Sequence, residues 1–324
     1  MKALVYHKYG PPDVLNCEEI QKPSPKDDEI LIKVRAASIN PLDWRLMKGK
    51  PRLVGVVARL MKLPIGRPGV DFAGVVEMAG KGVTQFKPGD RVFGGCRGAF
   101  AEYVCASAAK VVSIPDEVTF EQAASVNVAG LSALQSLRDK ARIQTGETVL
   151  VNGAAGGVGT FAVQLGKVFG AEVTGVCSAG NVAMVKSIGA DSVVDYTSED
   201  FLKLGKRYDV ILDCVGNRSI AECRSILKPR GRHIMVGAAH DVNFTEILLN
   251  LAHALSVSIF STRKTIPLMG KANKEDLRFI AELIAGGKLD PVIDRRYKLS
   301  EGVDAFRYVE NGHARGKVLF TLGE

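Results

Sequence analysis

A glycine-rich turn between a strand and a helix constrains the fold of this chain more than any other feature of its sequence. The turn, residues 152–159, follows the apolar run 148–151 and leads into the helical pattern of residues 160–167. Strand, glycine turn and helix in this order are typical of a dinucleotide-binding domain. Small residues let the backbone approach a pyrophosphate, which the amides and the dipole of the helix N-terminus attract. Because glycine also serves ordinary turns, a purely structural turn is the alternative to a cofactor site formed by Gly153, Ala154, Gly156, Gly157, Val158 and Gly159.

The pattern of strands and helices predicts an α/β protein with two domains. Residues 1–120 contain short strand-like runs between glycines and prolines, which is typical of a small β-rich, barrel-like domain. From about residue 120, strands alternate with helices in the doubly wound pattern of a parallel sheet. Six strands are expected there, at residues 149–151, 173–177, 192–194, 210–213, 232–236 and 256–261. The last strands, 292–294 and 317–321, have no helical partner, so we predict that they return to the first domain. The predicted domains are therefore residues 1–120 with 265–324, and residues 121–264.

Composition excludes several classes of protein. The 324 residues carry a formal net charge of +8, but the basic residues are spread along the chain without interleaved aromatic residues, so nucleic-acid binding is not expected. A basic surface does attract cofactors that carry phosphate. No apolar run approaches the ~20 residues that span a bilayer, and the N-terminus is typical of a strand rather than of a signal peptide. Six cysteines without a Cys-x-x-Cys pair favour reduced thiols in the cytoplasm.

Two long motifs give this chain a family resemblance over essentially its full length. The first comprises the residues Gly146, Glu147, Leu150, Ala154, Ala155, Gly156, Gly157, Gly159, Gln164 and Lys167. The second runs through residues 69–76 and 86–94. Together they resemble the medium-chain dehydrogenase/reductase superfamily and, within it, the zinc-free quinone oxidoreductases (the zeta-crystallin-like branch). The resemblance implies a GroES-like catalytic domain, a Rossmann domain and an active site in the cleft between them. Ala154 replaces a glycine of the alcohol dehydrogenases, a change that the zinc-free branch tolerates.

The resemblance also implies that the catalytic zinc of the alcohol dehydrogenases is absent. Asn40 stands where those enzymes have a cysteine ligand, and Val70 stands where their Gly-His-Glu motif has its histidine. Their structural lobe with four cysteines has no counterpart in this sequence. A catalytic zinc needs about three protein ligands with nitrogen, sulfur or oxygen donors, and Val70 offers none. Without a Lewis acid to assist the oxidation of alcohols, we expect substrates that are already activated towards hydride, namely quinones and α,β-unsaturated ketones.

The strand after the glycine turn favours NADPH over NADH. Sites that prefer NAD place an Asp or Glu about 20 residues after the glycines, where it binds the ribose hydroxyls. Residues 173–190 contain no acid, so a 2′-phosphate would meet no repulsion there. The resemblance implies that Ser178, a lysine and Tyr196 hold this phosphate. Asn181 occupies the lysine position, and Lys186 lies one turn further on. Ordinary turn chemistry is the alternative role for Ser178 and Asn181.

Further contacts with the cofactor are expected from strand ends and from the resemblance. Ligands bind outside the carboxyl ends of parallel strands, which nominates Cys214, Val215, Gly237 and Ala238. The resemblance adds Asn40, which matches an asparagine that contacts the cofactor in quinone reductases. It also adds Arg315 and Lys317, for which a solvated pair of charges before a strand is the alternative. Trp44 follows the Asn40 loop and is interpreted either as a wall of the substrate pocket or as part of the core.

Two apolar segments suggest roles outside the cofactor site. Residues 52–62 have apolar positions at helical spacing, and we interpret them as a short amphipathic helix that covers the substrate pocket, with ordinary core packing as the alternative. The predicted strand at residues 256–260 is apolar, and related proteins commonly form dimers through the last Rossmann strand. An edge strand of this kind benefits from a partner, so a homodimer is expected.

These inferences predict a zinc-independent, NADPH-dependent oxidoreductase that transfers hydride to quinones or enones. No side chain is a compelling acid, so water is the expected final proton source. One alternative is an enoyl-thioester reductase of the same superfamily. The other is a non-catalytic NADPH-binding protein of the crystallin-like kind.

Overall fold

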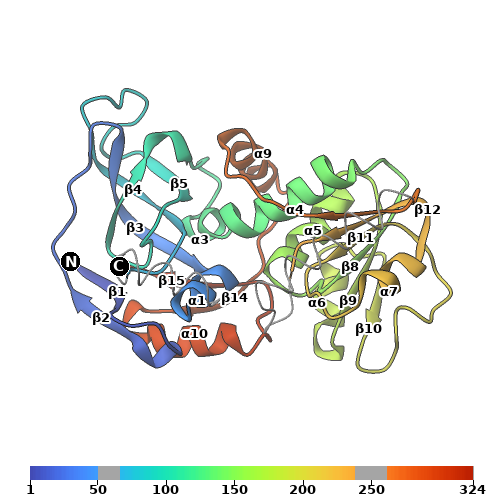
Figure 1. The fold of residues 1–324 in the computed structure, drawn as a ribbon. Coiled ribbons are helices and arrows are strands. Elements are labelled where there is room, and N and C mark those ends of the chain that lie inside the picture. The colour runs from blue at the N-terminus through green and yellow to red at the C-terminus, as the bar shows by residue number, and fades with distance from the viewer. Residues whose placement is uncertain (50–65, 238–260, 324) are drawn as a thin grey trace. The chain divides into compact units, whose positions relative to one another are not determined.

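The computed structural model describes residues 1–49, 66–237 and 261–323 (Figure 1). The chain divides into two compact units, which are described separately. The first unit comprises Met1–Leu131 and Ala272–Glu324, and the second comprises Ser132–Lys271. Within the described ranges, no helix is both long enough and apolar enough to cross a bilayer.

The first unit is built on a mostly antiparallel sheet whose strand order is β14-β15-β3-β4-β5-β7, with β6 pairing with β3. Strands β1 and β2 form a separate antiparallel pair. The strands are β1 (Lys2–Tyr6), β2 (Leu15–Glu19), β3 (Glu29–Ile39), β4 (Asp71–Ala79), β5 (Arg91–Gly95), β6 (Tyr103–Ser107), β7 (Val111–Ser113), β14 (Ile293–Tyr297) and β15 (Lys317–Thr321). The helices are α1 (Pro41–Met47), α3 (Phe120–Ala124), α9 (Lys274–Ala285) and α10 (Gly302–Glu310), with shorter turns at η1 (Pro12–Val14), η2 (Ala108–Lys110), η3 (Val126–Gly130) and η6 (Leu299–Glu301).

The core of the first unit joins residues from both of its chain segments. Phe100 stacks edge-to-face on Phe320 of β15, with ring centroids 4.9 Å apart, and on Phe306 of α10, at 5.9 Å. All three rings are fully buried, and aromatic pairs of this geometry add to the stabilisation from burial. The C-terminal segment is therefore an integral part of this β-rich, GroES-like unit.

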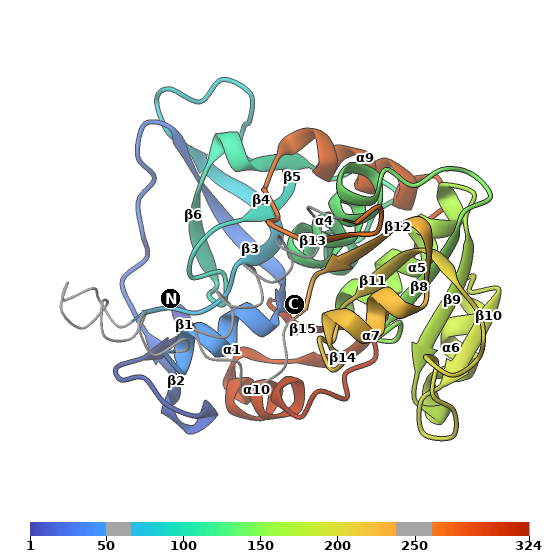
Figure 2. The same ribbon diagram turned by 45° about the vertical axis from the view of Figure 1, so that its right-hand side comes forward.

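The second unit contains the doubly wound parallel sheet that the sequence predicts (Figure 2). Its described strands pair in parallel in the order β10-β9-β8-β11-β12-β13. They are β8 (Thr148–Asn152), β9 (Glu172–Cys177), β10 (Ser192–Asp195), β11 (Tyr208–Asp213), β12 (Leu227–Met235) and β13 (Lys264–Pro267). The helices and turns are α4 (Leu131–Gln135), η4 (Ser136–Ala141), α5 (Gly157–Val168), η5 (Ala179–Asn181), α6 (Val182–Ser187) and α7 (Ile220–Ser225). Along the chain, β9 and β10 are added on one side of β8, and then β11, β12 and β13 are added on its other side. This is the arrangement of a Rossmann domain.

The described part of this sheet contains one strand that the sequence does not predict. The sequence predicts a strand at residues 256–261, whereas β13 lies after that range and pairs in parallel with β12. Lys264–Pro267 has a lysine, a proline and a single large aliphatic residue, Ile266, so it carries no strand signal of the kind used for the prediction. Residues 256–260, with the dimer interface proposed on them, lie outside the described residues. The same is true of the predicted helix at residues 52–62.

Candidate cofactor and catalytic site

The glycine turn has the backbone geometry that a dinucleotide site requires. β8 ends at Asn152, Gly153 follows with a φ of +84°, and α5 begins at Gly157. A Cβ atom at Gly159 would lie 2.1 Å from the carbonyl oxygen of Gly153, so only glycine allows α5 to start this close to the turn. The amides of Gly153 and Ala154 donate to the carbonyl of Val176 at 3.1 and 2.9 Å, which fixes the turn to β9. The first amides of α5 have no acceptor within the helix, and they are the donors suited to a pyrophosphate.

A second loop, after β11, lies against the glycine turn. A Cβ atom at Gly153 would lie 2.7 Å from Cγ2 of Val215, whose side chain is 37% exposed. Gly237, after β12, lies so close to Cys214 that a Cβ atom there would be 2.1 Å from the Cys214 carbonyl oxygen. Three of the nominated residues, Cys214, Val215 and Gly237, are thus brought to one edge of the sheet. The fourth, Ala238, lies outside the described residues.

The region predicted to select the cofactor contains an acid that sequence reasoning missed. Nδ2 of Asn181 donates to Oγ of Ser178 at 3.1 Å, and the backbone amide of Tyr196 donates to the carbonyl of Cys177 at 3.0 Å. Tyr196 is 55% exposed and Lys186 is also exposed. Parallel pairing of β10 with β9 sets Asp195 opposite Cys177. The Asp195 carboxylate already accepts hydrogen bonds from Oγ1 of Thr197 at 2.7 Å and from the backbone amide of Thr197 at 3.0 Å.

The most extensive buried polar network of the first unit surrounds Asn40. Its Nδ2 donates to Oδ2 of Asp71 at 2.9 Å and lies 3.3 Å from the carbonyl oxygen of Ser38. Its Oδ1 accepts from Nζ of Lys317 at 2.6 Å. Nζ of Lys317 also lies 3.9 Å from Oδ2 of Asp71, so the two side chains form a buried ion pair. Asp71 also accepts from Oγ of Ser38 at 3.0 Å and from Nδ2 of Asn127 at 2.9 Å.

Strand register explains why residues so distant in the sequence meet here. β3 pairs with β4 so that Ser38 lies opposite Asp71, and it pairs with β15 so that Ile39 lies opposite Val318. Asn40 directly follows β3 and is the N-cap residue of α1, where its backbone amide donates to Oδ2 of Asp43 at 2.7 Å. This bond from the N-cap amide to the third helical residue is one half of a capping box.

Lys317 and Arg315 have different environments, although the sequence places them together. Lys317 is only 2% exposed, so the alternative of a solvated pair of charges is wrong for this residue. Burial lowers the pKa of Lys317, while the charges of Asp71 and Asp43 act in the opposite direction. Arg315 is exposed, and its backbone amide donates to Oδ2 of Asp294 at 2.9 Å.

Trp44 lies in the hydrophobic core of the first unit. It is 3% exposed and belongs to the same cluster as Met47 and Phe100. The guanidinium of Arg45 and the ammonium of Lys48 lie 5.4 and 5.3 Å from its ring. This placement agrees with the interpretation of Trp44 as core, and a role in a substrate pocket stays a prediction.

In this network, the carboxyl of Asp43 has a pKa near neutral pH, so its charge changes in that range. Burial raises its pKa to about 7, and the charge of Asp71 adds to the rise, although the Asn40 amide and Lys317 oppose it. When the pKa of a carboxyl is higher in the folded than in the unfolded chain, the group contributes to stability at a pH below its pKa in the unfolded chain. This contribution is lost as the pH rises through its pKa in the folded chain.

We therefore predict that Asp43→Asn makes the protein less sensitive to alkaline pH. The asparagine keeps an oxygen that accepts from the Asn40 amide, but it cannot ionise. The melting temperature of the variant minus that of the parent should increase between pH 5 and pH 8. Thermal unfolding at four pH values measures this difference, and a difference that is constant with pH would contradict the assignment.

The residues of the Asn40 network do not fit a catalytic zinc. At the positions that the resemblance assigns to a cysteine and a histidine ligand, the chain has an amide and the half-buried apolar Val70. The ammonium of Lys317 is bonded to that amide, so a cation already lies beside it. Among the described residues, a cluster of three metal-ligand types occurs in the second unit instead, at Asp213, Cys223 and His233.

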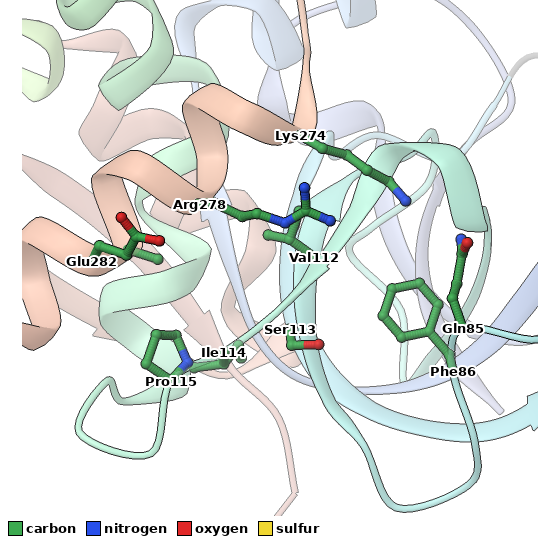
Figure 3. A pocket seen from close by; sticks show the side chains of 10 residues that line it. Gln85, Phe86, Val112, Ser113, Ile114, Pro115, Lys274, Arg278 and Glu282 are labelled. Atoms are coloured by element: carbon green, nitrogen blue, oxygen red, sulfur yellow. The ribbon is translucent and has the colours of Figure 1, made fainter.

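A pocket of about 380 Å³ on the first unit contains none of the predicted site residues (Figure 3). Lys274, Arg278 and Glu282 project from α9 along one side of it, and Phe86 and Ser113 lie opposite. The ammonium of Lys274 lies 5.7 Å from the centre of the Phe86 ring. Burial and the charge of Arg278 lower the pKa of Lys274.

Comparison with known proteins identifies the family. A model of the alcohol dehydrogenase GroES-like domain matches residues 26–116, and a model of a zinc-binding dehydrogenase domain matches residues 188–319. The chain is 35% identical to a chloroplast envelope quinone oxidoreductase homolog of Arabidopsis thaliana, over 98% of both chains. It is 34% identical to 2-methylene-furan-3-one reductase of Solanum lycopersicum, over 98% of this chain and 78% of the relative.

Solved structures agree with this assignment. The quinone oxidoreductase of Coxiella burnetii superposes with a TM-score of 0.87 at 34% identity, covering 100% of this chain and 99% of that one. CurK enoyl reductase superposes with a TM-score of 0.86 at 25% identity, covering 99% of both chains. Escherichia coli quinone oxidoreductase complexed with NADPH superposes with a TM-score of 0.84 at 26% identity, covering 99% of this chain and 100% of that one. The chain therefore belongs to the medium-chain dehydrogenase/reductase superfamily, and within it to the oxidoreductases related to quinone oxidoreductase.

Proposed function

We propose that this protein is a zinc-independent, NADPH-dependent oxidoreductase that transfers hydride to quinones or α,β-unsaturated ketones. The observation that carries the proposal is the Lys317–Asn40–Asp71 network, in which the amide of Asn40 stands where zinc enzymes of the superfamily have a cysteine ligand and is bonded to the buried ammonium of Lys317. Relatives named as quinone oxidoreductases and as an enone reductase support the substrate class.

The cofactor in this proposal is held by the glycine turn and the strand ends around it. The first amides of α5 bind the pyrophosphate, and the close packing of Gly153 against Val215 brings the loop after β11 to the same place. NADPH supplies a hydride when it is bound. The full set of proposed cofactor contacts is Asn40, Gly153, Ala154, Gly156, Gly157, Val158, Gly159, Ser178, Asn181, Lys186, Tyr196, Cys214, Val215, Gly237, Ala238, Arg315 and Lys317.

The hydrogen bonds of Asn40 restrict what its side chain can do. An asparagine amide has two N–H donors and one carbonyl oxygen with two lone pairs. Nδ2 directs its donors at Asp71 and the Ser38 carbonyl, and Lys317 takes one lone pair of Oδ1. One lone pair of Oδ1 is therefore left to accept a further hydrogen bond. In our proposal Asn40 therefore accepts a hydrogen bond from an N–H of the cofactor and does not donate to the substrate carbonyl.

This restriction favours substrates that need little activation by the protein. Precise placement of the reacting groups can contribute a large share of a rate enhancement. With Asn40 unable to donate, the oxygen that gains charge must be stabilised by other dipoles or by water. Quinones and enones are suited to such a site because their conjugated carbonyls accept hydride readily.

Two other functions make different predictions in the same assay. The similarity to CurK enoyl reductase supports an enoyl-thioester substrate as the second candidate. A binding protein without catalysis is the third. NADPH oxidation should be measured with an ortho-quinone, an enone and an enoyl-thioester. We expect turnover of the first two. Turnover of the thioester alone would replace the proposed substrate class, and no turnover with any of the three would refute the proposal of an enzyme.

The preference for NADPH can be tested at the end of β9. Ser178→Asp would place a carboxylate where the 2′-phosphate is proposed to bind. Repulsion and lost hydrogen bonds should cost about 2–3 kcal/mol, or roughly 30- to 150-fold in the KM for NADPH. The KM for NADH should change by less than about threefold. Ser187→Asp, on the exposed end of α6, is the control. Equal losses for both cofactors would contradict the assignment of Ser178.

The compartment and the oligomeric state are also part of the proposal. The described cysteines are all free thiols, which supports a reducing compartment such as the cytoplasm. Relatives are named for chloroplasts and mitochondria, so fractionation of the source cells is the direct test. A homodimer through residues 256–260 can be tested by the mass of the protein in solution.

A further inference from the structure

A buried group of polar side chains lies next to the proposed cofactor loops, and the proposed reaction assigns it no role. It consists of Asp213 at the end of β11, Cys223 on α7 and His233 on β12. The three residues are 3%, 1% and 1% exposed. Both ring nitrogens of His233 are buried without a hydrogen-bond partner among the described residues. An unsatisfied polar group in a protein interior is costly, so this histidine needs an explanation.

Asp213 connects this group to both cofactor loops. Its Oδ1 accepts from the amides of Val215 and Gly216 at 3.1 and 2.9 Å, which shapes the loop after β11. The same oxygen accepts from Nδ2 of Asn152 at 2.8 Å. Asn152 is the last residue of β8 and directly precedes Gly153, where the glycine turn begins. One carboxylate oxygen therefore holds two loops that are separate in the sequence.

The other oxygen of Asp213 faces His233. Nε2 of His233 lies 3.8 Å from Oδ2, which is within range for electrostatic attraction but longer than a hydrogen bond. A hydrogen bond between these two atoms needs a closer approach than 3.8 Å. Burial alone would raise the pKa of Asp213, but the imidazole and the two loop amides more than offset it, so the pKa lies below its ordinary value. The Asp213 carboxylate is thus ionised, and an N–H at Nε2 of His233 would be a donor directed at its Oδ2.

We propose that His233 is a positioning residue that fixes the two cofactor loops through Asp213. A carboxylate with three donors on Oδ1 and, among the described residues, none on Oδ2 can rotate, and rotation would move the amides of Val215 and Gly216 and the side chain of Asn152. A hydrogen bond from Nε2 of His233 prevents this rotation. The inference rests on the proposed function, because it takes these loops to be the ones that hold NADPH.

A metal ion held by the same three side chains is the competing explanation. The ligand atoms lie within 4.8 Å of one another, but a buried zinc site ordinarily has four ligands. Oδ1 of Asp213 is already engaged with three donors. The geometry points to a histidine–carboxylate pair.

The test compares His233→Phe with His233→Gln in the full chain. The phenylalanine fills the space without a donor, whereas glutamine restores an N–H. We expect His233→Phe to raise the dissociation constant and the KM for NADPH about tenfold, with kcat changed by less than about twofold. His233→Gln should recover most of the affinity. Tyr208→Leu, at the opposite end of β11, should lower the melting temperature without changing NADPH affinity.

The possible results separate this inference from the proposed function. If the parent chain does not bind NADPH, the proposed function fails. If the parent binds NADPH and His233→Phe binds it equally well, the role of His233 is refuted. One equivalent of metal in the purified parent, lost in both His233 variants, would also overturn the inference, because the three side chains would then be ligands.

Discussion

Lys317→Met is expected to destabilise the first unit by about 3–5 kcal/mol, because it removes one partner of a buried ion pair. Lys317 and Asp71 are 2% and 0% exposed, with Nζ 3.9 Å from Oδ2. Methionine fills a similar volume, so the lost charge and not a cavity causes the effect. The Asp71 carboxylate keeps its hydrogen bonds to Ser38 and Asn127 but loses its only described cationic neighbour within ion-pair distance. Chemical denaturation measures the change in the free energy of unfolding.

Two further variants show whether charge pairing is the cause. In Asp71→Asn/Lys317→Met both charges are absent, so the double variant should be more stable than Lys317→Met alone. Lys110→Met, at an exposed position of the same unit, should change the stability by less than about 0.5 kcal/mol. If the double variant is no more stable than Lys317→Met alone, an unpaired Asp71 charge is not the cause of the loss.

Gly159→Ala is expected to weaken the binding of NADPH by at least about 100-fold, or roughly 2.7 kcal/mol. The added Cβ atom would lie 2.1 Å from the Gly153 oxygen and 2.8 Å from Cα of Ala154. Both are backbone atoms, so the turn itself must open and the first amides of α5 must shift. Titration calorimetry with NADPH measures the loss, and a lower melting temperature should accompany it.

Gly156→Ala is the control for the packing of the turn only, because Gly156 is itself a proposed cofactor contact. A Cβ atom there meets only the Gly153 oxygen, at 3.5 Å, which is an ordinary contact. The variant should keep the stability of the parent. If it nevertheless binds NADPH more weakly, the pyrophosphate passes against residue 156. If Gly159→Ala binds NADPH as the parent does, the glycine turn is not the cofactor site.

The doubly wound sheet could be predicted because its signals are local. Each central strand is a short apolar run, and each spacer has a helical pattern, so the order along the chain determines the architecture. Helix α9, Lys274–Ala285, has signals of the same local kind, because Asn273 caps a strongly periodic segment. β13 was missed because four residues with one large aliphatic side chain give no such signal. The strands that the sequence places correctly are those with buried apolar residues.

The polar partners could not be predicted, because they depend on register between distant segments. Lys317 and Asn40 are 277 positions apart and meet only because β15 pairs with β3. The sequence therefore left open whether Lys317 was a solvated charge. In the same way, Asp195 comes opposite Cys177 through strand pairing and not through proximity along the chain. Nothing near His233 in the chain indicates a link to Asp213, because the two residues meet through the pairing of β11 with β12.

Transfer of deuterium from NADPH that carries deuterium at both C4 positions tests the central proposal most directly. The reaction should be run with an enone and with enzyme treated with a chelator, after elemental analysis has confirmed that zinc is absent. We predict one deuterium at the β-carbon of the product, formed at the rate of the untreated enzyme. A product without deuterium, or turnover that begins only when zinc is added, would contradict a zinc-independent transfer of hydride.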